Sequence, residues 1–358
     1  MSSKRITITD IARESGASPT TVSLVLRDKP GIGTDTRDRV LAAAQSLGYE
    51  RKLASSARPG HEVTTVAILF RARARSSYDR SFGVNPFYSW VLTGMESVAR
   101  TKHMNLLYGT LAVNGENEII DAPDHLLTQD LHGVIVVGAF SQSAIDRLLA
   151  QRPFPLVLVD GPSVPQRFDI IASDNKGGAR IAVEHLIANG HREIGLISRT
   201  AGSNPNFEER EAGYRAAMAA AGLSPVVGRI AEEDVSPAFD QVLAQQPDTT
   251  ALFCVNDQFA LDAVKVASSC GYHVPATMSI IGFDNTDHAM AVEPGLTTMN
   301  VDKVGMGRQA VLALEYRTHW PDAAPGCLLL SPRLITRGTV APLIAAPIAN
   351  SSEQIAAG

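Results

Sequence analysis

The stretch that decides the fold of the N-terminal part of this chain is ITITDIARESGASPTTVSLVL, residues 6–26. Its apolar residues recur at helical spacing on both sides of Gly16, and glycine readily adopts the left-handed backbone of a sharp turn. We expect a first helix whose start is capped by Thr9 or Asp10. Ser18 as N-cap and Pro19 in the first turn predict the start of a second helix.

A third helix is predicted over residues 34–47, ended by Gly48. Apolar residues spaced three and four apart face a small core, which comprises Val22, Val25 and Leu26 of the second helix and Val40, Leu41, Ala44 and Leu47 of the third. A unit of this size is too small for most enzyme chemistry, but its second helix can enter the major groove of DNA. A three-helix cap without a DNA role is the alternative.

The outward side of the second helix carries Thr20, Thr21, Ser23 and Leu24. Short polar side chains can approach phosphates and base edges closely, and a leucine can pack on a thymine methyl group. This face is therefore a candidate for DNA contact.

Charge favours the DNA-binding interpretation. Residues 1–60 carry ten basic and six acidic side chains, a net charge of +4. Because the whole chain carries −5, residues 61–358 carry −9. A basic headpiece on an acidic body is typical of a protein in which only the headpiece binds a polyanion.

The composition indicates a headpiece plus two sizeable cores, since the chain has 358 residues and is 45% hydrophobic. No stretch is long and apolar enough to span a membrane, and residues 1–4 do not resemble a signal peptide. Cys254, Cys270 and Cys327 are far apart and odd in number, as expected of reduced thiols in a cytoplasmic protein.

The body alternates short β-rich runs with helical patterns. Strands are predicted over 65–70, 104–108, 133–138, 156–160, 194–198, 252–255 and 279–284, and helices near 87–102, 142–150, 174–189, 207–221, 235–245, 257–271 and 302–318. This alternation predicts an α/β fold with parallel sheets covered on both faces, and the number of strands indicates two lobes. Ligands of such sheets bind at the carboxyl ends of the strands, so we expect a cleft between the lobes.

Residues at the ends of these strands nominate a ligand site. Asp160, Asp284 and the Asn256-Asp257 pair follow apolar strands. Arg210 lies near the start of a helix, and Phe87 and Tyr88 open the first helix of the body. Carboxylate, guanidinium, amide and aromatic groups together suit a polyhydroxylated ring, and a purine is the alternative ligand. The alternative roles are structural ion pairs for the charged residues, a helix cap for Asn256 and core packing for the two aromatic residues.

Sequence motifs for catalysis are absent. The chain has no Gly-x-Ser-x-Gly elbow, no phosphate-binding Gly-x-x-x-x-Gly-Lys loop, no dinucleotide fingerprint after the first body strand and no His-Glu-x-x-His pair. The cysteines and histidines are not spaced along the sequence as the ligands of a metal site would be. We therefore expect neither an enzyme nor a cofactor or metal site.

A resemblance to a known family rests on motifs that run through nearly the whole chain in order. They are residues 6–26, 36–40 and 47–49 in the headpiece, and 85–88, 157–160, 173–178, 190–195, 210–214, 256–257, 281–284, 296–298 and 337–342 in the body. Together they resemble the LacI/GalR family of bacterial transcription regulators. The resemblance implies a helix-turn-helix headpiece on a two-lobed, periplasmic-binding-protein-like body. It also implies effector contacts at Arg210 and Asp284.

The predicted domains follow from this resemblance and from the strand pattern. They are a headpiece over 1–49, a hinge over 50–62, a body over 63–342 and a tail over 343–358. Lobe one is expected near 63–172 and 301–326, and lobe two near 173–300 and 327–342. The tail has no heptad pattern, so nothing in it predicts a tetramerising coiled coil.

The hinge departs from the family pattern. Relatives carry a Pro-Asn pair and then a leucine that wedges into the minor groove, whereas this chain has Arg51 and Lys52 at the pair and Arg58 at the wedge. An arginine fills a narrow groove electrostatically without unstacking a base step, so we expect weaker DNA bending or a wedge supplied by Leu53. Leu24 stands where many relatives have a base-reading arginine.

The sequence thus predicts a DNA-binding regulator, more specifically a repressor, that binds a pseudo-palindromic operator as a homodimer and responds to a small effector, a sugar first. The candidate DNA contacts are Thr7, Ser18, Pro19, Thr20, Thr21, Ser23, Leu24, Arg27, Leu53 and Arg58. The rival interpretations are a solute-binding protein for transport and a sugar-processing α/β enzyme with an N-terminal interaction module.

Overall fold

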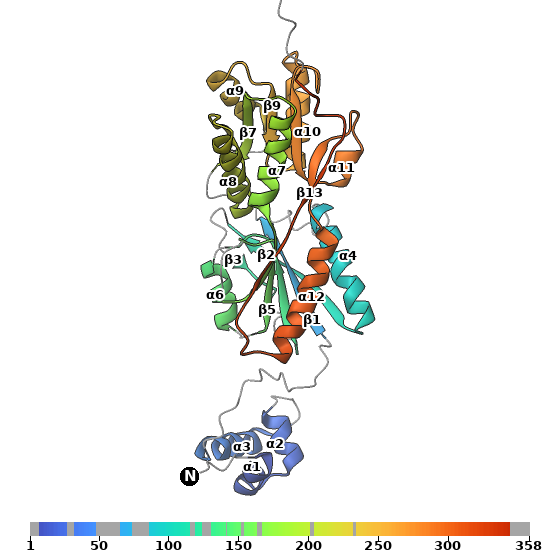
Figure 1. Cartoon of the computed structure of the whole chain (residues 1–358). Coiled ribbons are helices and arrows are strands. Elements are labelled where there is room, and N and C mark those ends of the chain that lie inside the picture. The colour runs from blue at the N-terminus through green and yellow to red at the C-terminus, as the bar shows by residue number, and fades with distance from the viewer. Residues whose placement is uncertain are drawn as a thin grey trace, which may run out of the picture. The chain divides into compact units, whose positions relative to one another are not determined.

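The computed structural model describes residues 7–26, 32–47, 65–73, 86–114, 119–123, 130–140, 142–151, 154–162, 167–200, 204–231 and 234–343 (Figure 1). The chain divides into two compact units, Met1–Ala57 and Arg58–Gly358. We call the first the headpiece and the second the body. Within the described part of the chain, every helix is too short or too polar to cross a membrane.

The headpiece contains the three predicted helices, α1 (Ile8–Ser15), α2 (Pro19–Leu26) and α3 (Thr34–Ser46). Gly16 has the left-handed backbone that the turn requires, with a φ of 63°. The Ser18 hydroxyl accepts a hydrogen bond from the Thr21 N–H at 3.0 Å, which confirms the predicted start of α2. Gly48 lies outside the described residues.

The predicted cap of α1 was wrong. The cap is Thr7, whose hydroxyl accepts from the Asp10 N–H, while the Asp10 carboxylate accepts from the Thr7 N–H at 2.8 Å. This reciprocal capping box draws Ile8 and Thr9 into the first turn, so the helix begins earlier than the apolar pattern suggests.

The headpiece core differs from the prediction at Leu41 and Ala43. Ile11, Ala12, Val22, Val25, Val40, Ala43 and Ala44 are buried, and Leu26 and Leu47 pack against them. Leu41, predicted to be buried, is 46% exposed. Each residue turns a helix by about 100°, so Ala43 and Ala44 continue the stripe that begins at Val40, whereas Leu41 points away from it.

Lobe one of the body is a seven-stranded sheet in the order β12-β6-β5-β4-β1-β2-β3. Its strands are β1 (Thr65–Arg73), β2 (Asn105–Val113), β3 (Ile119–Asp121), β4 (Gly133–Val137), β5 (Leu156–Val159), β6 (Asp169–Ser173) and β12 (Cys327–Leu330). Helices α4 (Pro86–Thr101) and α12 (Lys303–His319) pack on one face, and α6 (Gln142–Gln151) packs on the other.

Lobe two is a six-stranded sheet in the order β13-β11-β10-β9-β7-β8. Its strands are β7 (Ile194–Arg199), β8 (Val226–Ile230), β9 (Ala251–Cys254), β10 (Ser279–Asp284), β11 (Thr297–Asn300) and β13 (Arg333–Ile335). Its helices are α7 (Asn175–Ala188), α8 (Pro205–Ala220), α9 (Ser236–Gln245), α10 (Asp257–Ser269) and α11 (Asp287–Met290). The predicted headpiece and two α/β lobes of mostly parallel strands are confirmed.

The boundary predicted near residue 327 was wrong. Strand β12 pairs with β6 in lobe one, so the chain returns to lobe two after Leu330. The sequence pattern missed β12 because it is a four-residue edge strand whose leucines are partly exposed.

Helices α4 and α12 approach each other closely at two glycines. A Cβ atom at Gly94 would overlap the carbonyl oxygen of Val304, and one at Gly307 would overlap the carbonyl oxygen of Val91. Because both glycines face backbone, the two helices pack as a tight pair, and any added side-chain atom would force them apart.

Candidate functional site

Two carboxylates lie at strand ends with unusual backbone. Asp160 directly follows β5 and has a φ of 61°, and Asp284 ends β10 with a φ of 107°. Asn285 is also left-handed, with a φ of 50°. Residues other than glycine adopt this region at an energetic cost, and such strain concentrates at binding sites. Both strand ends are therefore candidate binding positions.

Arg210 of α8 is held in one orientation by lobe two. Its side chain is 4% exposed, and Nη2 lies 3.0 Å from Oδ1 of Asp284. Nε donates to Oδ1 of Asn175 at 2.8 Å, and Nη1 donates to the carbonyl oxygen of Val255 at 2.6 Å. The guanidinium carbon lies 3.8 Å from the ring centroid of Phe283. The guanidinium is thus a preorganised donor beside a carboxylate.

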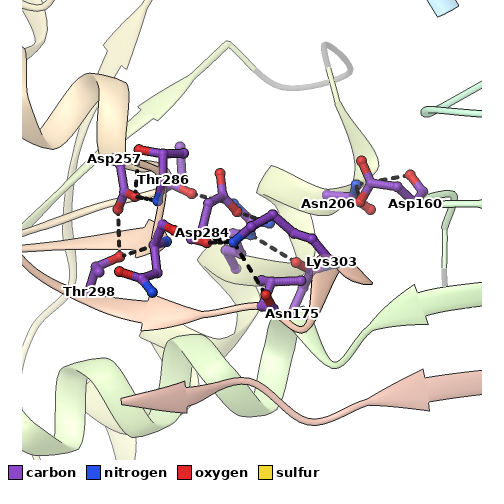
Figure 2. A network of polar contacts seen from close by, with 12 residues as sticks. Asp160, Asn175, Asn206, Asp257, Asp284, Thr286, Thr298 and Lys303 are labelled. Atoms are coloured by element: carbon purple, nitrogen blue, oxygen red, sulfur yellow. Dashed lines mark hydrogen bonds and ion pairs between the residues drawn. The ribbon is translucent and has the colours of Figure 1, made fainter. Parts of the chain in front are cut away.

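Asp160 connects the two lobes. Its carboxylate accepts from the hydroxyl of Tyr88 at 3.0 Å and from Nδ2 of Asn206 at 2.9 Å. Tyr88 belongs to α4 in lobe one, whereas Asn206 belongs to α8 in lobe two. Figure 2 shows Asn206 beside Asp160. The carboxyl ends of the strands of both sheets therefore meet at Asp160, as the two-lobe prediction requires.

Burial changes the acidity of this site. It raises the pKa of Asp160 to about 7, and the neighbouring Asp284 adds to the effect, although Arg210 opposes it. Burial also raises the pKa of Asp284, against the opposing charges of Arg210 and Lys303. The site therefore holds more protons near neutral pH than exposed aspartates would.

The raised pKa of Asp160 predicts a pH dependence of stability. Between about pH 4 and pH 7 the folded state binds this proton and the unfolded state does not, so the free energy of unfolding falls as pH rises through that range. Asp160→Asn should remove the contribution of Asp160 to this slope and stabilise the protein by roughly 2 kcal/mol near pH 8. The contribution of the buried Asp257, whose pKa burial also raises to about 7, should remain. Urea unfolding of both proteins from about pH 4 to pH 8 measures the effect, with the exposed Asp322→Asn as control. A variant with the wild-type pH slope would contradict the prediction.

The other predicted effector residues show structural contacts. Oδ1 of Asn256 accepts from the Phe259 N–H at 2.8 Å, which is the helix-cap role that was the alternative. Phe87 is 6% exposed and packs in the core of lobe one. Tyr88 is half-buried and reaches Asp160. The structure thus brings Tyr88, Asp160, Arg210 and Asp284 together, while Asn256 caps α10 and Phe87 packs in the core beside Tyr88.

Three polar residues of this network were missed from the sequence: Asn175, Asn206 and Lys303. Asn206 lies one helical turn before Arg210, a spacing that signals a shared helix face. The Asp257 carboxylate is fully buried and accepts from the N–H and hydroxyl of Thr286 and from the hydroxyl of Thr298 (Figure 2). It thereby fixes the segment that follows Asp284.

The headpiece presents most of its candidate DNA contacts to solvent. Thr7, Ser18, Pro19, Thr20 and Leu24 are exposed, and Thr21 and Ser23 are half-buried. Thr7 and Ser18 also cap their helices. Arg27, Leu53 and Arg58 lie outside the described residues.

Two family models match the chain. The model for bacterial regulatory proteins of the lacI family matches residues 7–52, and that for the periplasmic binding protein-like domain matches residues 183–340. The chain belongs to the lacI family. It is therefore a DNA-binding transcriptional regulator with an effector-binding domain, and the prediction that it is not an enzyme is confirmed. Its family also agrees with the predicted cytoplasmic location.

Full-length relatives resemble this lacI-family chain from end to end. The HTH-type transcriptional repressor PurR of Photobacterium profundum is 29% identical over 344 residues, covering 93% of this chain and 98% of the relative. Catabolite control protein A of Priestia megaterium is 28% identical over 315 residues, which cover 86% of this chain and 91% of the relative. The solved complex of the transcriptional regulator CelR with cellobiose is 25% identical and has a TM-score of 0.66. The match covers 94% of this chain and 100% of the solved chain.

Proposed function

We propose that this lacI-family regulator is a repressor whose operator affinity is controlled by a sugar or sugar derivative bound between the lobes. The observation that carries the proposal is the buried Arg210–Asp284 pair, which lies with Asp160 where the strands of both lobes end. Relatives include a repressor named PurR and a regulator solved with cellobiose, so the family alone leaves the effector open.

The chemistry of the site favours a polyol. Each hydroxyl of a sugar both donates and accepts, so adjacent hydroxyls can donate to Asp284 while accepting from Arg210. Asp160 offers a further acceptor from lobe one, and Tyr88 contributes a half-buried ring beside it. Thermal-shift screening against monosaccharides, disaccharides and purine bases tests the effector class. A shift with purines alone would replace the sugar by the alternative effector.

DNA binding would require two headpieces. One three-helix unit covers only a few base pairs, so a homodimer that reads two half-sites of a pseudo-palindromic operator is the natural arrangement. The exposed face of α2 would enter the major groove, with Thr20 and Leu24 one turn apart. In vitro selection from random-sequence DNA, followed by gel shifts at several salt concentrations, tests sequence-selective binding.

Leu24 is expected to read the operator. Leu24→Ala should weaken binding to the selected operator by about tenfold, because it removes an apolar contact to a base, and should leave binding to random DNA unchanged. Leu41→Ala is the matched control, since Leu41 is also exposed but lies on α3. Fluorescence anisotropy measures both affinities. Equal losses for the two variants would show that Leu24 has no special role.

A further inference from the structure

Lys303 joins the two lobes at the candidate site. It is the first residue of α12, which packs in lobe one, yet its ammonium group donates to the carbonyl oxygens of Asp284 at 2.5 Å and Asn285 at 3.2 Å in lobe two. A third hydrogen bond reaches the carbonyl oxygen of Val301 at 3.3 Å, in the segment that crosses between the lobes. Figure 2 shows Lys303 and Asp284 within one polar network.

The ammonium group is buried and its hydrogen bonds are satisfied. Lys303 is 7% exposed, and its three N–H donors match three carbonyl acceptors. On the lobe-one side, Nζ lies 5.7 Å from the ring centroid of Phe87 in α4. A charge placed in this way at the junction of two lobes would be left without partners if the lobes separated there.

The segment that Lys303 holds is the strained one. Asp284 and Asn285 are two successive left-handed residues, and such strain persists only where several contacts fix it. Asn300 and Arg337 bind the Asn285 side chain, and Asp257 binds Thr286. These three restraints come from lobe two or the chain that follows β13, whereas Lys303 reaches the segment from α12.

We propose that Lys303 is a positioning residue that aims the Asp284 carboxylate at the effector and transmits effector binding to lobe one. This proposal rests on the proposed function, because it takes Asp284 as a residue that contacts the effector. A shift of the Asp284 and Asn285 carbonyl groups would displace the Lys303 ammonium group that is hydrogen-bonded to them. Helix α12 would then move together with α4, because the two helices are in backbone contact at Gly94 and Gly307. The part of the coupling that runs through α12 therefore passes through the Lys303 ammonium group, beside the contact that Asp160 makes with Asn206.

Hydrogen exchange of the full-length chain without any sugar tests the positioning role. Lys303→Met should speed exchange of the Asn285 and Thr286 amides by about tenfold or more, while Lys303→Arg, which keeps the donors, should restore slow exchange. Lys265→Met is the matched control, because Lys265 is exposed and pairs with Asp262 on α10. Wild-type exchange in Lys303→Met would overturn the proposal.

Operator binding tests the transmission, with cellobiose and ribose as probes. The ratio of operator Kd values without probe and at a probe concentration that saturates each protein should fall to about 1 in Lys303→Met, and Lys303→Arg should regain most of the wild-type ratio. A Lys303→Met protein that keeps the wild-type ratio would overturn transmission. If no sugar of the thermal-shift screen binds the wild-type protein, the proposed sugar effector fails, and the exchange experiment still decides the role of Lys303.

Discussion

Arg210→Met is expected to abolish effector binding and to destabilise the body by roughly 3–5 kcal/mol. The change removes the cation beside the buried Asp284 carboxylate, and it leaves the Asn175 side chain and the Val255 carbonyl without their donor. An uncompensated buried charge is the main source of the loss. Arg210→Lys keeps the charge but loses the planar fork, so we expect it to recover part of the stability and little of the effector affinity.

A double variant separates folding from binding. Arg210→Met with Asp284→Leu removes both charges, so its free energy of unfolding should lie above that of Arg210→Met alone. Effector binding should remain absent, because neither donor nor acceptor is left. Urea unfolding and calorimetric titration measure the two properties. If the folded double variant bound the effector with wild-type affinity, Arg210 and Asp284 would not be part of the binding site.

Gly307→Ala is the second change with a large expected effect. Its new Cβ atom would overlap the Val91 carbonyl oxygen, which is backbone and cannot turn aside, so α4 and α12 must separate. Overpacking of this kind costs typically 1–3 kcal/mol, and we expect the upper end or more because helix backbone must shift. The loss should appear as a lower midpoint in urea unfolding.

The control for Gly307 lies in the same lobe. At Gly326 the nearest atom to an added Cβ, an Asp169 carboxylate oxygen, is 3.8 Å away, so Gly326→Ala should change stability by less than about 1 kcal/mol. If Gly307→Ala unfolds at the same urea concentration as the wild-type protein, the helices do not depend on this contact.

Local patterns predicted the longer helices and seven of the strands, because helix periodicity and apolar strand runs are properties of short segments. The Ser18-Pro19 start of α2 and the Gly16 turn are examples, and both are confirmed. Local patterns missed the strands β3, β6, β8, β11, β12 and β13. The sequence pattern gave the wrong result where contact with another residue or strand determines whether a helix cap or a strand forms. Thr7 and Asp10 cap each other, and β12 forms only because β6 offers it an edge.

The candidate site was predicted in part for the same reason. Asp160, Arg210 and Asp284 follow recognisable strand ends or helix starts, and the structure brings them together. Asn206 and Lys303 could not be placed, because their partners are distant in sequence and belong to the other lobe. Burial also decides acidity, so the pKa of about 7 at Asp160 depends on packing rather than on residue type.

We expect an effector bound between the lobes to change the affinity of the headpiece for DNA. Fluorescence anisotropy with the selected operator, with and without the effector found by thermal-shift screening, measures this directly. We predict salt-sensitive, sequence-selective binding whose Kd changes by about 5–150-fold with effector, and an effector Kd that changes by the same factor with operator. An operator Kd that is the same at zero and saturating effector, or binding without sequence preference, would contradict the account.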